Sequence, residues 1–408
     1  MTKLQERGWL DSAAVQRAFD VLEQDGDVAR AVGGTVRNSL LGEVVDDVDI
    51  ACTALPDVVL ARAKAAGVKA VPTGVDHGTV TLVIDHRPIE VTCLREDVET
   101  HGRHATVKFG RDWTKDAERR DFTMNAVYVD RHGDLFDPLG GVEDCLNRHL
   151  RFIGDARARI REDYLRILRF FRFFATYGRG DINPEGYAAC LELKDGLAHL
   201  SKERITKEVL RTLTAPRTLD ALELMEQGGI LKLILGEDAD CLRLKRLLQL
   251  EDLPEAAADP VLRLGGLAGP QVCEHLRLSN GQKKQIEVAA AVAEALRSSG
   301  QSTQDLKALL VAHGTAGVID GLLTAWMYGF VQSEAQLREM LDFAQGWEIP
   351  TFPLTGKLMI AAGIPAGPGM GKAMRLAQQI WADADYQCPA DQLMAELKTL
   401  LGDKGKKT

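Results

Sequence analysis

The sequence predicts an α+β protein in which a small N-terminal sheet domain precedes an all-helical remainder. Residues 27–150 hold short segments rich in β-branched residues and bounded by Gly, Pro, Asp or His, which is typical of strands. From Asp155 to about residue 400, apolar residues recur at helical spacing and strand patterns nearly disappear. A chain of 408 residues with 45% hydrophobic content should form two to four folded domains.

The N-terminal elements follow from local patterns. An amphipathic helix is expected over residues 12–26, and VRNSLLG and LPDVVLARAKAAG are further helix candidates. The strand candidates are VARAVGG, DDVDIACTA, VTLVIDH and PIEVTCL. These elements predict a first domain over residues 1–150.

The second half reads as successive helices. The first, REDYLRILRFFRFFATYG, is expected to run as one helix from Glu162, and SKERITKEVLRTLT follows it. We expect a helical neck over residues 151–215 and a helical body and tail over residues 216–408. Breaks rich in Pro, Gly or acidic residues divide the body and tail at 252–260, 298–304 and 348–368.

Composition limits the compartment and the partners. Seven cysteines are scattered without a CxxC pair, which favours reduced thiols in a cytoplasmic protein. No signal peptide or membrane span is expected. The net charge is −9, yet residues 101–172 hold 15 basic and 12 acidic side chains, so a focused basic site on an acidic body is possible.

Two aspartates define a candidate metal site. Asp47 and Asp49 lie two residues apart in a predicted strand, so both carboxylates project from one face. Glu90, in RPIEVTCLR, is well placed to add a third carboxylate from a neighbouring strand. D-x-D by itself is more often a polar strand face or a turn.

A glycine-rich turn precedes this pair. In GGTVRNSLLG, Gly33 and Gly34 end a strand and open a helix, where the backbone can approach a phosphate and Arg37 adds positive potential. The segment is neither GxGxxG nor a P-loop. A phosphate cradle beside a metal site is what nucleotidyl transfer requires, and three carboxylates can bind two Mg²⁺ ions.

Eight motifs in order give the sequence a family resemblance. It resembles the class II tRNA nucleotidyltransferases and bacterial poly(A) polymerases, whose N-terminal domain is a polymerase-β-like nucleotidyltransferase sheet. The matching segments are GGTVRNSLLG with DVDIA, HGTV, IEVTCLR, RRDFTMNA, DPLGGVED, EDYLRILRFFRF and SKERITKEVL.

The resemblance implies roles for individual residues. Asp47 and Asp49 match the metal ligands, and Glu90 matches the third catalytic carboxylate. The residues implied to bind the nucleotide are Gly33, Gly34, Arg37, Arg120, Asp121, Asn125, Asp163, Arg166, Arg169 and Arg172.

Four of these are spaced three residues apart on the helix expected from Glu162. The resemblance implies that Asp163 and Arg166 read the base edge of CTP or ATP, with Arg169 and Arg172 as nearby cations. A carboxylate and a guanidinium can pair with cytosine or adenine, and a mismatched base would leave buried groups unpaired. GTP and UTP should therefore be rejected.

We therefore expect a Mg²⁺-dependent enzyme that adds C, C and A to the 3′ end of tRNA from CTP and ATP, holding the acceptor stem by shape and backbone charge. The alternatives are a poly(A) polymerase, an enzyme adding only CC or only A, and a non-catalytic RNA-binding scaffold. Two departures from the family pattern are notable. Asn38 replaces a frequent Asp and could weaken a hydrogen bond that orients Arg37, and Asp46 replaces a basic residue.

Overall fold

A computed structural model describes the chain except for residues 1–2, 75–77, 102–103, 251–252, 257 and 405–408. The chain forms two compact units. Unit 1 comprises Met1–Ala239 with Glu274–Arg277, and unit 2 comprises Asp240–Cys273 with Leu278–Thr408. The predicted boundaries at 150 and 215 both fall inside unit 1.

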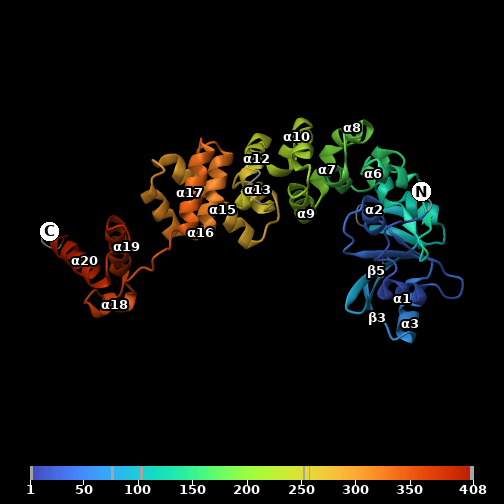
Figure 1. The fold of residues 1–408 in the computed structure, drawn as a ribbon, viewed down its shortest axis with the longest axis horizontal. Helices are drawn as coiled ribbons and strands as arrows, with labels where there is room; N and C mark the ends of the chain where they lie inside the picture. Colours follow the sequence, from blue (N-terminus) through green and yellow to red (C-terminus); the bar gives the residue numbers. More distant parts are fainter. Residues whose placement is uncertain (1–2, 75–77, 102–103, 251–252, 257, 405–408) are drawn as a thin grey trace. The chain divides into compact units, whose positions relative to one another are not determined.

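Unit 1 begins with a seven-stranded sheet in the order β3-β4-β5-β2-β1-β8-β9 (Figure 1). The β2–β5 pair is parallel, and the other pairs in this sheet are antiparallel. Two further strands, β6 and β7, form a separate hairpin. The strands are β1 (Ala29–Val32), β2 (Val48–Cys52), β3 (Lys69–Gly74), β4 (Thr79–Ile84), β5 (Arg87–Cys93), β6 (Arg95–His101), β7 (His104–Phe109), β8 (Tyr128–Val129) and β9 (Leu135–Phe136).

The two faces of this sheet differ in polarity because side chains alternate along each strand. Ile89, Val91 and Cys93 of β5 are buried in the main apolar core. That core also contains residues of α1 (Ala13–Leu22) and α3 (Pro56–Ala65), which pack against β4. Asp49 and Glu90 project from the opposite face, which also carries an apolar cluster that includes Val32, Ala51 and Tyr128.

The remaining described elements of unit 1 are helices, including the short 3₁₀ helices η2 and η3. Helix α7 packs against α9 and α10, so its apolar residues are buried. The helices are α2 (Gly34–Leu41), α4 (Trp113–Glu118), η2 (Thr123–Asn125), α5 (Gly141–Leu146), α6 (Ala156–Glu162), α7 (Leu165–Tyr177), α8 (Pro184–Glu192), η3 (Lys194–His199), α9 (Lys202–Leu213), α10 (Thr218–Gln227) and α11 (Ile230–Leu235).

The helix predicted to run from Glu162 is wrong at its start. Helix α6 ends at Glu162, and Asp163 is extended with φ −155° and ψ 105°. The Asp163 carboxylate accepts a hydrogen bond from the backbone N–H of Leu165 at 3.1 Å, a local bond that competes with helix continuation. Asp163 is therefore on the break between α6 and α7.

Unit 2 is entirely helical in its described residues, apart from connecting loops. A separate apolar core, with Trp381 and Tyr386, joins α18, α19 and α20. Its elements are α12 (Cys241–Leu248), η4 (Pro254–Ala256), α13 (Pro260–Ala268), α15 (Asn280–Ser298), α16 (Thr303–Met327), α17 (Glu334–Gly346), α18 (Gly356–Ala361), α19 (Pro368–Asp383) and α20 (Ala390–Lys404). Helix α14 (Val272–His275) includes residues of both units.

Within the described residues, α16 has the length and apolar composition of a membrane span. The core helix of a globular protein can have the same composition, and α16 packs against α15 and α17. Gly314, at φ 73° and ψ 168°, also interrupts it, leaving two helical segments. Each segment is shorter than the roughly 20 residues needed to cross a bilayer.

Candidate nucleotidyltransferase site

The turn between β1 and α2 brings backbone next to charged side chains. Gly33 has φ 73°, a left-handed conformation that favours glycine. A Cβ built on Gly33 would lie 3.8 Å from Nη1 of Arg120 and 4.0 Å from Oδ2 of Asp49. A Cβ on Gly34 would lie 3.5 Å from Nη2 of Arg37. The glycine turn thus lies among Asp49, Arg120 and Arg37.

The carboxylates lie on the two parallel strands of the sheet. Asp49 of β2 and Glu90 of β5 are directly paired, so their side chains project from the same face. Asp47 lies one residue before β2, which begins at Val48, so the prediction that both aspartates lie within the strand is wrong for Asp47. Thr35 binds the backbone where β2 begins. Its hydroxyl donates to the Asp47 carbonyl and accepts from the Asp49 N–H, both at 3.1 Å.

Asp49 has an unusual electrostatic environment. Burial raises the pKa of its carboxyl to about 6, with further contributions from the negative charges of Glu90 and Asp47. The positive charges of Arg120 and Arg37 act in the opposite direction without cancelling this effect. The neighbouring arginines therefore do not supply enough positive charge to keep the pKa of Asp49 at its usual value.

This donor set fits a divalent cation that also binds a substrate. In the described part of the chain, no three His, Cys, Asp or Glu side chains form a closed metal cage. Mg²⁺ commonly uses one or two carboxylates together with substrate phosphates and water. A partly buried Asp49 repelled by Glu90 and Asp47 is the arrangement that such a cation would neutralise.

Arg37 is buried close to this cluster, with 6% of its surface exposed. Its Nη1 donates to Oδ1 of Asn125 at 2.5 Å, and its Nη2 donates to the hydroxyl of Tyr177 at 2.8 Å. Its Nε has no hydrogen-bond partner, and no described carboxylate forms an ion pair with it. Burial lowers the pKa of Arg37. An anion would supply both the missing charge and the missing acceptor.

Asn38 keeps the hydrogen bond that the sequence puts in doubt. Its Oδ1 accepts from Nη2 of Arg37 at 3.0 Å, and its Nδ2 donates to the Val44 carbonyl at 2.9 Å. The second bond fixes the orientation of the amide. Asn38 therefore still orients Arg37, as a neutral acceptor. Asp46, the other departure, is exposed, and nothing in the structure explains it.

Arg120 is held by a residue absent from the sequence prediction. Asp116 of α4 is 1% exposed and accepts from Arg120 Nη2 at 3.1 Å, from Arg119 Nε at 2.8 Å and from the Tyr128 hydroxyl at 2.8 Å. Burial alone would raise the pKa of Asp116, but Arg120 and Arg119 hold it below its usual value. Its spacing of three and four residues from two arginines was a usable signal.

Asp121 joins the sheet domain to helix α7. Its Oδ2 accepts from Nε of Arg169 at 2.8 Å, and its Oδ1 accepts from Nδ2 of Asn125 at 2.9 Å. Since Asn125 also binds Arg37, these contacts form one continuous network from Arg169 to Arg37. Burial opposes ionisation of Asp121, but Arg169 holds the pKa of its carboxyl below the usual value.

Asp163 and Arg166 have separate partners. Oδ2 of Asp163 accepts from Arg204 at 2.6 Å, and Arg166 donates to Glu162 at 2.6 Å. A cavity of about 430 Å³ is lined partly by Asp163 and Arg204. Further along α7, Arg172 pairs with buried Glu208 of α9 at 2.5 Å. Glu162 is four residues from Arg166, whereas Arg204 and Glu208 lie on α9, 41 and 36 residues from their partners, so no spacing pattern predicts these two pairs.

The sequence and structure of this chain are similar to those of known proteins. A family model described as "Poly A polymerase head domain" matches residues 29–151, and one described as "Probable RNA and SrmB- binding site of polymerase A" matches residues 181–241. The chain is 33% identical to the mitochondrial CCA tRNA nucleotidyltransferase 1 of Danio rerio, over 93% of this chain and 89% of that protein.

The chain belongs to the CCA tRNA nucleotidyltransferase family. The CCA-adding enzyme of Geobacillus thermodenitrificans is 39% identical over 53% of each chain. The crystal structure of the Bacillus stearothermophilus CCA-adding enzyme in complex with CTP is similar, with a TM-score of 0.75, 26% identity, and coverage of 97% of this chain and 98% of that one.

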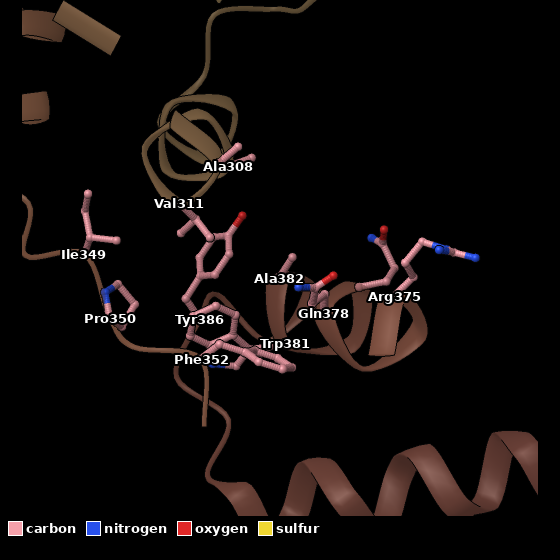
Figure 2. Close-up of a pocket in the computed structure, with 12 residues that line it drawn as sticks. Ala308, Val311, Ile349, Pro350, Phe352, Arg375, Gln378, Trp381, Ala382 and Tyr386 are labelled. Atoms are coloured by element: carbon pink, nitrogen blue, oxygen red, sulfur yellow. The ribbon is translucent and has the colours of Figure 1, made fainter. Parts of the chain in front are cut away.

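Family membership makes the chain a nucleotidyltransferase, and confirms the predicted fold class and the resemblance. Nucleotidyltransferases of this family use a divalent metal ion, for which Asp49 and its neighbours supply a fitting donor set. The predicted site residues all lie in unit 1. A separate cavity of about 620 Å³ in unit 2 is lined by apolar and aromatic residues such as Val311, Phe352 and Trp381 (Figure 2).

Proposed function

We propose that this chain adds C, C and A in turn to the 3′ end of tRNA, using CTP and ATP and releasing pyrophosphate. In this reaction the terminal ribose hydroxyl attacks the α-phosphate of the nucleotide in line. Relatives that match nearly the whole chain carry the name of this activity, and the similar bacterial structure is a complex with CTP.

One observation carries the proposal. Next to the Gly33–Gly34 turn, a buried guanidinium lacks an anion and a partly buried carboxylate lacks a cation. Arg37 and Asp49 thus carry opposite charges beside one backbone turn, and the neighbouring side chains do not fully balance either charge. A nucleoside triphosphate with its bound metal ion supplies both charges at once.

The carboxylates are assigned to the metal. We assign Asp47 and Asp49 as ligands of Mg²⁺ and Glu90 as the third catalytic carboxylate. When bound, Mg²⁺ lowers the pKa of the attacking hydroxyl and neutralises the triphosphate. The chain's own contribution is to hold these carboxylates on adjacent strands, where Asp49 and Glu90 are directly paired.

The remaining residues of the site are assigned to the nucleotide. Gly33, Gly34 and Arg37 take the phosphates, helped by Arg120, whose guanidinium lies beside the glycine turn. Asp121 and Asn125 hold the arginines in place and border the sugar. This assignment follows the hydrogen-bonded network from Arg169 to Arg37.

We assign base selection to Asp163 and Arg166. Cytosine and adenine both present an amino group beside a ring nitrogen, so an acceptor carboxylate and a donor guanidinium can recognise either base. Guanine and uracil present a carbonyl in place of that amino group, which would leave the carboxylate without a donor. Arg169 and Arg172 are cations on the same helix, held by Asp121 and Glu208.

The domain roles are part of the proposal. Residues 1–150 form the catalytic domain, residues 151–215 the neck that reads the base, and residues 216–408 the body and tail that hold the acceptor stem. The RNA-binding family model over residues 181–241 supports an RNA contact at the junction of neck and body. All seven cysteines are free thiols, which supports a reducing compartment such as the cytoplasm.

A primer-extension assay tests the proposal. tRNA transcripts ending before CCA, after C and after CC are incubated with the protein, Mg²⁺, and CTP, ATP or both, and products are sized on a sequencing gel. We expect three additions with both nucleotides, then a stop. EDTA should abolish extension, and GTP or UTP should not support it.

Each of the other outcomes would indicate a different activity for this chain. A ladder of added A residues would make the chain a poly(A) polymerase, the name carried by the family model of its first domain. A halt after CC, or activity confined to the CC-ending transcript, would show an enzyme with half of the pathway. No extension on any transcript would favour a non-catalytic RNA-binding scaffold.

A further inference from the structure

Tyr177 is the last residue of α7, and its side chain contacts the phosphate-binding arginine of the first domain. The Tyr177 hydroxyl accepts from Nη2 of Arg37 at 2.8 Å, and its ring centroid lies 4.1 Å from the Arg37 guanidinium carbon. Phe173, one turn earlier, lies 5.1 Å from the same carbon. One end of α7 therefore holds Arg37 by a hydrogen bond and by two cation–π contacts.

These contacts matter because Arg37 has few other restraints. A buried guanidinium is usually fixed by a carboxylate, and no described carboxylate pairs with Arg37. Its Nη2 is held by Tyr177 and Asn38, and its Nη1 by Asn125. Neutral acceptors orient the guanidinium and leave its charge available to a ligand.

We propose that Tyr177 is a positioning residue that aims Arg37 at the nucleotide phosphates and makes this aim depend on α7. The inference rests on the proposed function, in which Arg37 binds phosphate. Of the base-reading residues, Arg166 lies in the first turn of α7 and Asp163 lies just before it, whereas Tyr177 is the last residue of α7. The same helix therefore connects a base-reading side chain to the phosphate-binding arginine.

The test compares ligands with and without the β- and γ-phosphates. Tyr177→Phe keeps the aromatic ring and removes only the hydroxyl. By titration calorimetry with Mg²⁺ present, we expect CTP to bind about 10-fold more weakly to Tyr177→Phe, with CMP binding unchanged within about twofold. In the extension assay, the KM for CTP and ATP should rise while the KM for tRNA stays constant.

Tyr187→Phe is the matched control. The Tyr187 hydroxyl donates to the Leu224 carbonyl at 3.0 Å, so this variant also loses one tyrosine hydrogen bond in the helical part of unit 1. It should bind CTP as the parent protein does. Equal loss of CTP, CMP and tRNA affinity in Tyr177→Phe would show a merely structural role and overturn the proposal, as would CTP binding within twofold of the parent protein.

Asn38→Ala provides a second, independent variant, because Asn38 holds the same Nη2 atom. We expect Asn38→Ala to lower the affinity for CTP about threefold. Because both side chains hold the same Nη2 atom, the effect of combining Asn38→Ala with Tyr177→Phe should differ from the product of the two single effects. Arg37→Lys separates the failure of this inference from failure of the proposed function. If Arg37→Lys leaves the CTP-over-CMP preference intact, the phosphate role of Arg37 is wrong, whatever Tyr177 does.

Discussion

In unit 1, three largely shielded ion pairs join residues far apart in the sequence, whereas many ion pairs of unit 2 join neighbours on one helix. Asp121–Arg169, Asp163–Arg204 and Arg172–Glu208 each connect different elements. In unit 2, Glu294–Arg297 and Glu334–Arg338 are exposed pairs three and four residues apart. Exposed helix pairs contribute about 0.3–0.5 kcal/mol, and removing one partner of a buried pair costs about 3–5 kcal/mol. We therefore expect substitutions of ion-paired residues to destabilise unit 1 more than unit 2.

The largest expected effect is at Asp49. Asp49→Asn removes the carboxylate that we propose as a metal ligand, and we expect CCA addition to fall at least about 1,000-fold. The same change should raise the stability of the metal-free protein. Because burial raises the pKa of Asp49 to about 6, its ionisation near pH 7.5 disfavours the folded state, by roughly 1–3 kcal/mol.

Extension assays and thermal melts with EDTA measure the two parts of this prediction. The control is Asp342→Asn on the exposed surface of α17, which should change neither. Normal activity in Asp49→Asn would refute the metal assignment. A lower melting temperature would refute the electrostatic account of this carboxylate.

The second effect in size is at Asp121. Asp121→Asn leaves Arg169, whose side chain is 29% exposed, without its carboxylate, so we expect a loss of about 1–3 kcal/mol in the stability of unit 1. Limited proteolysis and thermal melts should show earlier opening of unit 1. Unchanged melting would mean that the Asp121–Arg169 pair is replaceable, and the contrast between the units would lose its main support.

A smaller effect, of opposite sign, is expected at Asp320 in unit 2. Burial raises the pKa of this carboxyl, although Gln285 donates a hydrogen bond to it. Its ionisation therefore disfavours the fold, and Asp320→Asn should be slightly stabilising at pH 7. This advantage should shrink as the pH falls through the folded pKa, where Asp320 becomes protonated. Melting temperatures of both proteins from pH 7 to pH 4 measure the trend, and an advantage that grows on acidification would contradict it.

The smallest effect concerns a helix cap in unit 2. Ser279 and Gln282 form a capping box at the start of α15, so Ser279→Ala should cost about 1 kcal/mol of unit 2 stability. Ser298→Ala, at the other end of α15, should cost less. We expect both variants to keep full CCA addition at 25 °C. Loss of activity in Ser279→Ala without loss of stability would show that unit 2 positions are less exchangeable than argued.

The sequence predicted some parts of this structure better than others. Features set by neighbouring residues were predicted, and features set by distant residues were not. The two predicted classes of element, and the place of Glu90 on a strand beside Asp49, follow from short-range patterns of β-branched and polar residues. The start of α7 was mispredicted because one hydrogen bond from Asp163 to the Leu165 N–H outweighs a strong apolar periodicity. Periodicity averages over a segment and cannot register a single local competitor.

The partners of the site residues were the least predictable part. Tyr177 and Arg204 lie 140 and 41 residues from the side chains that they hold. Neither has a spacing signal, because tertiary packing brings the helices together. Asp116 is different, since its distance of three and four residues from Arg119 and Arg120 could have been read as a local ion-pair cluster. The roles assigned to these residues stay predictions.

The buried charge of Arg37 also affects the stability of the folded protein when no ligand is bound. Without a bound anion, the fold contains a buried cation whose Nε–H lacks an acceptor, a situation that costs about 1–3 kcal/mol. A ligand that binds only the folded state removes this cost and shifts the folding equilibrium by mass action. Under the proposed function, the nucleotide therefore stabilises the folded protein as well as serving as its substrate, and we expect CTP or ATP to raise its melting temperature.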